Sequence, residues 1–211
     1  MARPPHVRQM QRGLLPVLLS TDPPPSDLRQ SAVLVLLFPS RQDVSFLLTE
    51  RPHSLSSHAG QMSLPGGARE PEDENLCATA LRETSEELGI DTTDLEVLGR
   101  LEDVDVRVSG YTITPFVAWS DHPPHVRPQP NEVASVLPVP LHALLAGEAV
   151  RHETWDMRGS LWEVSLYRFS GFAVWGATAR ILAHLAARFE SDVPAPHPLP
   201  GHVRPLGHDR V

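Results

Sequence analysis

The chain has 211 residues and a formal net charge of −8, with 18 Lys and Arg against 26 Asp and Glu. This length suits one domain with tails. The acidic balance argues against broad binding to nucleic acid or to a membrane surface, but it allows an anionic substrate that is held through a metal ion. A single Cys excludes an intramolecular disulfide framework, and no apolar run approaches the ~18 residues of a transmembrane helix.

Proline clusters divide the chain. The first 20 residues carry a basic start and a short apolar run, but Pro16 interrupts that run and no small-residue cleavage pattern follows. We therefore expect a cytoplasmic protein. A Pro triplet at 23–25 and a Pro- and His-rich stretch that begins at Pro194 mark two boundaries. The predicted divisions are an N-terminal extension over 1–30, a main domain over 31–190 and a disordered tail over 191–211.

Hydrophobic patterning predicts strands mixed with helices. Pro115 indicates a bulge or a sheet edge within its strand, and a Pro-rich stretch over 123–130 predicts a long loop. The pattern predicts an α/β (α+β) fold in which helices cover both faces of a mixed sheet. The predicted strands cover 32–38, 44–48, 95–101, 111–119 and 161–169, and the predicted helices cover 75–88, 141–145 and 172–189.

The segment 64–90 carries the most information about chemistry. Gly66 and Gly67 follow Pro65, which predicts a tight turn where the backbone bends or is closely approached. Three acidic residues at 72–74 precede the predicted helix, where carboxylates cap free N–H groups and complement the helix dipole. Gly89 is suited to the position just after the helix, where a left-handed conformation often ends it.

Three glutamates share one stripe of that helix, next to its buried side. Glu83, Glu86 and Glu87 are spaced i, i+3 and i+4, and like charges at this spacing cost about 0.2–0.5 kcal/mol per pair. A solvated helix face is the ordinary explanation of such a cluster, whereas a hard divalent cation gives it a purpose. Arg82 lies about 100° round the helix and could pair with a carboxylate of the preceding loop. The expected buried stripe consists of Cys77, Ala80, Leu81, Thr84 and Leu88.

The order of these features resembles the Nudix box, the loop-helix-loop signature of hydrolases that act on nucleoside diphosphates linked to another group. The acidic loop is one residue longer than the usual pattern, so either Asp73 or Glu74 stands for the first Glu of the box. Thr84 replaces an aliphatic residue. The resemblance implies a Nudix-type α/β/α sandwich. The matching residues are Gly67, Arg82, Glu83, Glu86, Glu87, Gly89 and Ile90.

A second motif resembles the coenzyme A diphosphatase branch of this family. The sequence LLTER at 47–51 and GQMSLPGG at 60–67 match its extra motif, and WGATAR at 175–180 is similar to its final helix. Three positions depart from the pattern: Pro52 replaces Ser or Ala, Ser56 replaces Arg, and Leu64 replaces Phe.

The resemblance implies hydrolysis of the diphosphate bond of coenzyme A to 3′,5′-ADP and 4′-phosphopantetheine, with Mg²⁺ or Mn²⁺ as cofactor. The partner is then a small-molecule substrate, with no nucleic acid and no membrane. Glu102 and Asp103 are weaker candidates for the general base, and Arg107 and Tyr111 are further candidates for substrate contact. The implied roles are metal binding for Glu83, Glu86 and Glu87, catalysis for Glu86 or Glu132, substrate binding for Arg51, Gly66 and Gly67, and structure for Arg82 and Gly89.

Three alternatives stay open. The same chemistry could act on ADP-ribose, a dinucleotide or an oxidised nucleotide. A binding-only regulator could use the same fold without turnover, because fold does not fix function. A nucleic-acid decapping role needs a basic surface that the net charge does not suggest. The sequence does not choose between the two metals and leaves the oligomeric state open.

Overall fold

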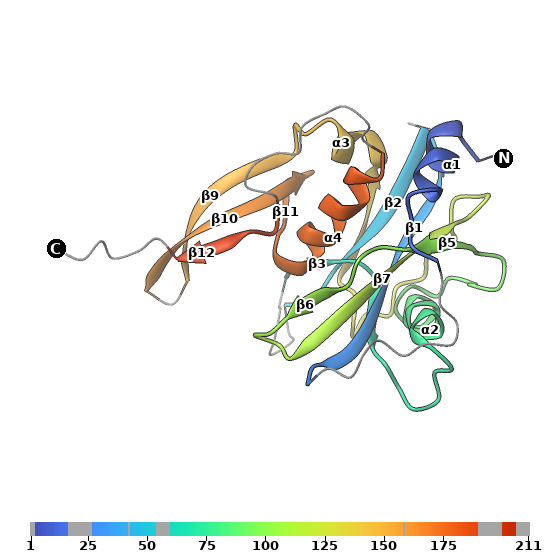
Figure 1. Cartoon of the computed structure of the whole chain (residues 1–211), viewed down its shortest axis with the longest axis horizontal. Helices are drawn as coiled ribbons and strands as arrows, with labels where there is room; N and C mark the ends of the chain where they lie inside the picture. Colours follow the sequence, from blue (N-terminus) through green and yellow to red (C-terminus); the bar gives the residue numbers. More distant parts are fainter. Residues whose placement is uncertain are drawn as a thin grey trace.

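The computed structural model describes residues 3–16, 27–41, 43–53, 60–157, 159–189 and 200–205. Figure 1 shows a main sheet with helices on both sides and a smaller sheet beside it. The elements in chain order are α1 (Pro5–Gln11), β1 (Arg29–Ser40), β2 (Asp43–Glu50), β3 (Met62–Ser63), β4 (Gly66–Ala68), α2 (Leu76–Leu88), β5 (Glu96–Arg100), β6 (Val104–Val106), β7 (Tyr111–Trp119), β8 (Ser135–Pro140), α3 (Leu141–Leu145), β9 (Val150–Met157), β10 (Ser160–Phe169), β11 (Phe172–Val174), α4 (Gly176–Ala187) and β12 (Val203–Pro205).

The main sheet is mixed, as expected. Its strands follow the order β3-β2-β1-β7-β5, while β4, β6 and β8 pair with β1, β7 and β2. The pairing of β1 with β7 is parallel over nine residues, and the other pairings are antiparallel. A parallel central pair buried on both faces requires apolar side chains on both sides of the strand, and the apolar run of β1 supplies them.

The two faces of β1 belong to two separate apolar cores. Leu34 and Leu36 pack in the core beneath α2, whereas Val35 and Leu37 pack in a core shared with α1, α3 and α4. All four side chains are fully buried. The molecule is therefore an α/β/α sandwich, which confirms the predicted fold class.

Of the two alternatives predicted at Pro115, a bulge or a sheet edge, the edge is wrong because β7 lies inside the sheet. The β5–β7 pairing does contain a register shift, between Val97 and Gly99 of β5. The Pro115 carbonyl accepts the Leu101 N–H at 2.9 Å, on the side where β5 ends and β6 has not begun. A carbonyl and an N–H of one strand residue point to the same side. Proline is tolerated here because its missing N–H faces the interval between β5 and β6.

A second sheet contains β11, β10 and β12, with β9 paired to the other edge of β10. The predicted strand over 161–169 belongs to this sheet and not to the mixed sheet. Figure 1 shows its β9–β10 hairpin extending away from the main sheet. The predicted helix over 172–189 was too long at its start, because Phe172–Val174 forms β11 and α4 begins at Gly176. The apolar side chains Ile181, Leu182 and Leu185 do lie on α4 and are buried.

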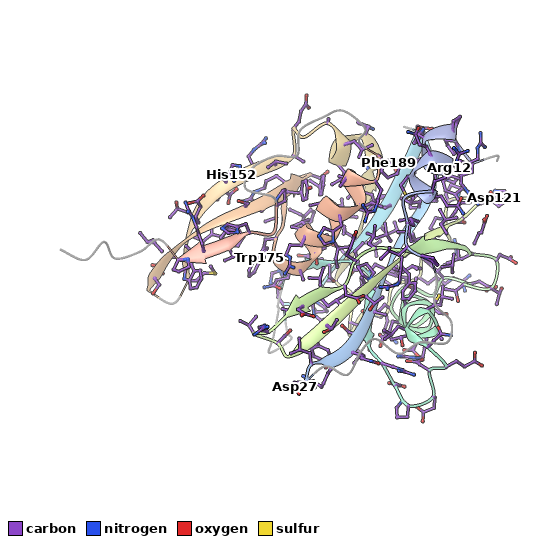
Figure 2. All side chains as sticks on the ribbon, in the orientation of Figure 1. Arg12, Asp27, Asp121, His152, Trp175 and Phe189 are labelled. Carbon is purple, nitrogen blue, oxygen red and sulfur yellow. The ribbon has the colours of Figure 1, made fainter. Side chains whose placement is uncertain are left out.

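The chain outside the predicted main domain also contributes structure. Val7 and Met10 of α1 are fully buried in the core that contains α4, and the His6 ring lies 6.2 Å from the ring of Phe189, which Figure 2 labels. Within the predicted disordered tail, Val203–Pro205 pairs with β10 as β12. The other described residues of that tail are 200–202, and the rest of it lies outside the described residues.

Candidate active site

Helix α2 begins and ends where its sequence predicts. The Asn75 side chain caps its start by accepting the Ala78 N–H at 3.0 Å, and Gly89 ends it in the left-handed region with φ of 61°. The cap is therefore Asn75 and not one of the acidic residues at 72–74. A left-handed residue after a helix favours glycine because it has no Cβ. These two ends fix which face of α2 meets the sheet.

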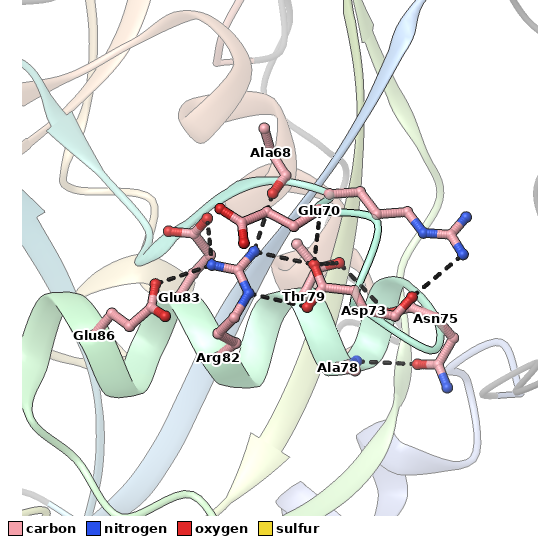
Figure 3. A network of polar contacts seen from close by, with 10 residues as sticks. Ala68, Glu70, Asp73, Asn75, Ala78, Thr79, Arg82, Glu83 and Glu86 are labelled. Carbon is pink, nitrogen blue, oxygen red and sulfur yellow. Dashed lines mark hydrogen bonds and ion pairs between the residues drawn. The ribbon is translucent and has the colours of Figure 1, made fainter.

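Arg82 ties α2 to the loop before it. Its Nε donates to Asp73 Oδ1 at 2.9 Å, and one terminal nitrogen donates to Asp73 Oδ2 at 3.0 Å and to the Ala68 carbonyl at 3.1 Å. The other terminal nitrogen contacts Glu83 at 3.1 Å and Glu86 at 2.9 Å. Figure 3 shows the guanidinium at the centre of this network. The expected pairing of Arg82 with a loop carboxylate is therefore present.

Asp73, and not Glu74, occupies the place of the first box carboxylate. Asp73 is buried and Glu74 is exposed. Asp73 also accepts the Thr79 hydroxyl and the Glu70 N–H, each at 2.9 Å. The hydrogen bonds from Arg82 lower the pKa of Asp73 to about 2. Its carboxylate is thus a fixed structural anion, because all its contacts stabilise the charged form.

The two glycines bring backbone against the glutamates of α2. Gly66 donates its N–H to Glu87 Oε2 at 3.3 Å. A Cβ on Gly67 would lie 2.4 Å from the carboxyl carbon of Glu83, and one on Gly66 would lie 2.3 Å from the Ala32 carbonyl oxygen. Gly66 has no room for a side chain because the atoms in the way are backbone of β1, whereas at Gly67 the Glu83 carboxylate would have to move. The turn is therefore held between β1 and the two carboxylates.

Glu83 and Glu87 form the electrostatically strained part of the site. Burial raises the pKa of Glu87 to about 8, and the nearby Glu83 and Glu132 carboxylates add to this effect. Burial also raises the pKa of Glu83. The sequence placed Glu87 on a stripe next to the buried one, but its exposed fraction is only 7%. A buried carboxylate near other anions is stabilised by a cation.

Glu86 differs from its two neighbours. Its side chain is 56% exposed, and its carboxylate forms the i, i+4 ion pair with Arg82. Figure 3 shows its carboxylate joined to the Arg82 guanidinium. Arg82 also contacts Glu83, but Glu86 is the most exposed of the three candidate ligands, whereas burial raises the pKa of the other two.

The loop before β8 carries Glu132 to the end of α2. Gln129 and Arg127 donate their N–H groups to the Glu87 and Leu88 carbonyls at 2.8 and 2.7 Å. The Ser135 hydroxyl donates to Glu50 at 2.7 Å, which anchors the far end of the loop to β2. Glu132 is exposed, and its charge raises the pKa of both Glu83 and Glu87. The structure thus brings Glu132 to the same site.

Arg51 approaches from the end of β2. Its backbone N–H donates to the Gln61 carbonyl at 3.0 Å, which closes the hairpin that leads through β3 to the glycine turn. Its charge lowers the pKa of Glu87, but no carboxylate pairs with it among the described residues. Its Nε is buried and has no hydrogen-bond partner in the described part of the chain. Ser56, at the position of the usual second cation, lies outside the described residues.

The weaker candidates lie elsewhere or serve other contacts. Glu102 pairs with Arg188, the residue that follows α4. Asp103 accepts from Arg100 and from Thr114. The Tyr111 ring lies 4.1 Å below the guanidinium of Arg29, and Arg107 is exposed. Cys77 is buried on the stripe where the sequence placed it.

The donor chemistry of the site fits a hard divalent cation, because Glu83 and Glu87 offer oxygen ligands whose charged forms are disfavoured by burial. Across the described residues no three His, Cys, Asp or Glu side chains are already gathered as a metal site. Glu86 is exposed and paired with Arg82, and the fit therefore rests on the buried Glu87 and on Glu83.

The family follows from comparison with known proteins. Residues 28–158 match the model of the NUDIX domain. The chain belongs to the Nudix family. Two relatives are named "Uncharacterized Nudix hydrolase NudL". One, from Photorhabdus laumondii, is 34% identical over 175 residues, which cover 82% of this chain and 93% of the relative. The other, from Citrobacter koseri, is 40% identical over 161 residues, which cover 75% and 81%.

Solved Nudix structures are more distant. RenU, a Nudix hydrolase from M. smegmatis, is 26% identical with a TM-score of 0.46, covering 54% of this chain and 71% of that one. The NUDIX domain of Shewanella oneidensis NrtR, solved with ADP-ribose, is 26% identical with a TM-score of 0.46, covering 61% and 84%.

The chain is therefore a Nudix hydrolase, an enzyme of the class that cleaves phosphoric anhydrides. Nudix hydrolases as a family generally use divalent metal ions, which agrees with the oxygen donors of Glu83 and Glu87. No helix in the described ranges is long and apolar enough to cross a membrane.

Proposed function

We propose that this Nudix hydrolase splits the diphosphate of coenzyme A into 3′,5′-ADP and 4′-phosphopantetheine. The observation that carries the proposal is the Arg51 guanidinium, whose buried Nε has no hydrogen-bond partner among the described residues and whose charge acts on the buried Glu87. Arg51 is the cation of the motif that resembles the coenzyme A branch. A half-buried cation that pairs with no carboxylate in the described ranges supports a role in binding a phosphate of the substrate.

Glu83 and Glu87 would hold Mg²⁺ or Mn²⁺ in this proposal, with Glu86 as a third ligand if it leaves Arg82. Such an ion neutralises the anionic oxygens of a diphosphate and acidifies a bound water. In this proposal the backbone of Gly66 and Gly67, which lies directly against Glu87 and Glu83, brings the substrate-binding turn next to the two carboxylates.

A general base must take the proton of the attacking water. Glu132 and Glu86 are the two candidates. We favour Glu132 because, unlike Glu86, it has no ion pair among the described residues, while its charge is felt at both Glu83 and Glu87. Arg82 and Gly89 keep structural roles in the proposal, since one fixes the acidic loop and the other ends the helix.

The test is a substrate comparison with purified full-length protein. Coenzyme A and ADP-ribose are incubated separately with Mg²⁺, with Mn²⁺ or with EDTA, and the products are resolved by chromatography. We expect release of 3′,5′-ADP that needs metal, is lost in Glu83→Gln and exceeds the cleavage of ADP-ribose. Cleavage of ADP-ribose alone would overturn the choice of coenzyme A.

Arg51→Ala tests the observation that carries the proposal, with Arg41→Ala as the matched control on an exposed arginine. We expect Arg51→Ala to lower kcat/KM for coenzyme A by tenfold or more, because a charge-assisted contact to phosphate is lost. Arg41→Ala should leave it unchanged. Equal effects of the two variants would show that Arg51 has no particular contact with the substrate.

A further inference from the structure

Two tryptophans form a corner between the second sheet and α4. The Trp155 ring on β9 and the Trp175 ring at the start of α4 lie 5.4 Å apart and nearly perpendicular, at 74°. Trp162 on β10 is the cross-strand partner of Trp155, so three of the four tryptophans of the chain lie in or next to this sheet. Figure 2 labels Trp175 between the second sheet and the main one.

This corner lies next to the strand that leads into the candidate active site. Strand β11, which ends one residue before Trp175, packs against β3. Strand β3 pairs with Thr49 and Glu50, the two residues before Arg51. It also leads directly to the turn of Gly66 and Gly67. The corner therefore borders the same end of the main sheet as the cation of the site.

The two indole rings differ in the hydrogen bonding of their N–H groups. Trp155 is fixed, because its indole N–H donates to Glu153 at 2.7 Å and Glu153 accepts two hydrogen bonds of 2.9 Å from Arg168. The Trp175 indole N–H has no partner among the described residues. Both rings are partly exposed. An edge-to-face pair with one fixed ring and one free N–H offers a flat surface and a hydrogen-bond donor.

We propose that the Trp155–Trp175 corner binds the nucleobase of the substrate. A nucleobase has two flat faces that stack on an indole ring, and it carries acceptor nitrogens on its edge that suit a free N–H. The inference rests on the proposed function only in that the substrate is a nucleotide. It holds equally for coenzyme A and for ADP-ribose, since both carry an adenine.

The experiment measures binding without turnover. The full chain in EDTA is titrated by calorimetry with AMP, with ribose 5-phosphate and with pantetheine. We expect AMP to bind at least tenfold more tightly than ribose 5-phosphate, and Trp175→Leu to abolish this difference. Trp175→Phe keeps an aromatic face and should bind AMP within about threefold of wild type. Binding of pantetheine but not of AMP would overturn the nucleobase assignment.

Trp162→Leu is the matched control, because it makes the same change on β10, in the sheet that carries Trp155, at a residue outside the pair. It should leave AMP affinity unchanged. If Trp162→Leu weakens AMP binding as much as Trp175→Leu, the tryptophans only hold the sheet in place and the inference fails. AMP binding that depends on Trp175 in a protein without diphosphatase activity would refute the proposed reaction but support the corner.

Discussion

Asp73 and Arg82 meet through two hydrogen bonds of 2.9 and 3.0 Å that join the acidic loop to the catalytic helix of the Nudix box. The side chain of Asp73 is only 5% exposed and that of Arg82 is 23% exposed. Breaking one partner of such a pair leaves the other charge poorly compensated. The pair therefore fixes where Glu83 and Glu86 stand, since both also contact the same guanidinium.

The first prediction concerns stability. Asp73→Asn should lower the free energy of unfolding at pH 7 by about 3 kcal/mol, because it removes the charge of the buried carboxylate that accepts two hydrogen bonds from Arg82. That half-buried cation is then left with only Glu83 and Glu86 as carboxylate partners among the described residues. Urea denaturation measures the loss. Asp94→Asn, on an exposed aspartate nearby in the sequence, should change it little.

The stabilisation that the Asp73–Arg82 pair provides is lost in a defined range of acid pH. A carboxyl whose pKa is lowered in the folded state stabilises the protein above its unfolded pKa, and the contribution is lost as the pH falls through the folded value. For Asp73 this window runs from 3.8 down to about 2. The difference between wild type and Asp73→Asn should therefore shrink below pH 4. A difference that stays constant down to pH 2 would contradict the lowered pKa.

The second prediction reverses this sign at Glu87, whose pKa rises from 4.5 to about 8. Between these values the folded state holds a proton that the unfolded state has lost, so stability falls as the pH rises, by at most about 1.4 kcal/mol per pH unit. Glu87→Gln should lack this slope and should exceed wild type in stability near pH 8. Urea denaturation in EDTA at pH 5, 6.5 and 8 measures both.

A bound metal ion should also remove the fall in stability with rising pH. A divalent cation at Glu83 and Glu87 stabilises their charged forms, so Mn²⁺ should stabilise wild type most at pH 8 and stabilise Glu87→Gln much less. Glu86→Gln is the matched control on the same helix, and it should keep most of the metal effect because Arg82 already compensates Glu86. Equal metal effects in Glu87→Gln and wild type would exclude Glu87 as a ligand.

The third prediction separates the candidates for the general base. Glu132→Gln should lower kcat by 100-fold or more with little change in KM, because general bases contribute about 10²–10⁴-fold. It should also flatten the acid limb of the pH profile of kcat/KM. Glu102→Gln should leave kcat unchanged, since Glu102 pairs with Arg188 at the end of α4. If Glu86→Gln abolishes turnover and Glu132→Gln does not, Glu86 is the base.

The sequence predicts the parts of the site that depend on local rules. Helix α2 matched closely because Asn75 and Gly89 are cap residues at its two ends, and α3 matched at both bounds. The burial of Glu87 could not be read from the helix, because it depends on Gly66 of β4 and on the loop that carries Glu132. Local patterning does not contain contacts between such distant segments.

Two other failures have the same origin. The polar sequence of β9 gave no strand signal, because its side chains alternate between half-buried and exposed and it pairs only along one edge. The burial of Val7 and Met10 depends on packing against α4. The sequence of a short and basic helix does not predict such packing.

The last prediction tests the narrow turn at Gly66. This glycine has φ of 149°, and an added Cβ would lie 2.3 Å from the Ala32 carbonyl and 2.6 Å from the Val33 Cα. Both are backbone atoms of the central strand β1, so neither can move aside cheaply. Gly110 is the control: its φ is 73°, but nothing lies within 4 Å of an added Cβ. Gly110→Ala should then cost only the backbone strain, about 1 kcal/mol.

Gly66→Ala should cost several times more than Gly110→Ala in the free energy of unfolding, because it adds a steric clash to the strain. It should also displace the N–H that Glu87 accepts, and any residual fold should bind Mn²⁺ more weakly. Urea denaturation of the two variants and calorimetry with Mn²⁺ measure these effects. Equal destabilisation by the two substitutions would mean that β1 yields to the Cβ, and the turn would then not be the rigid backing of the two carboxylates.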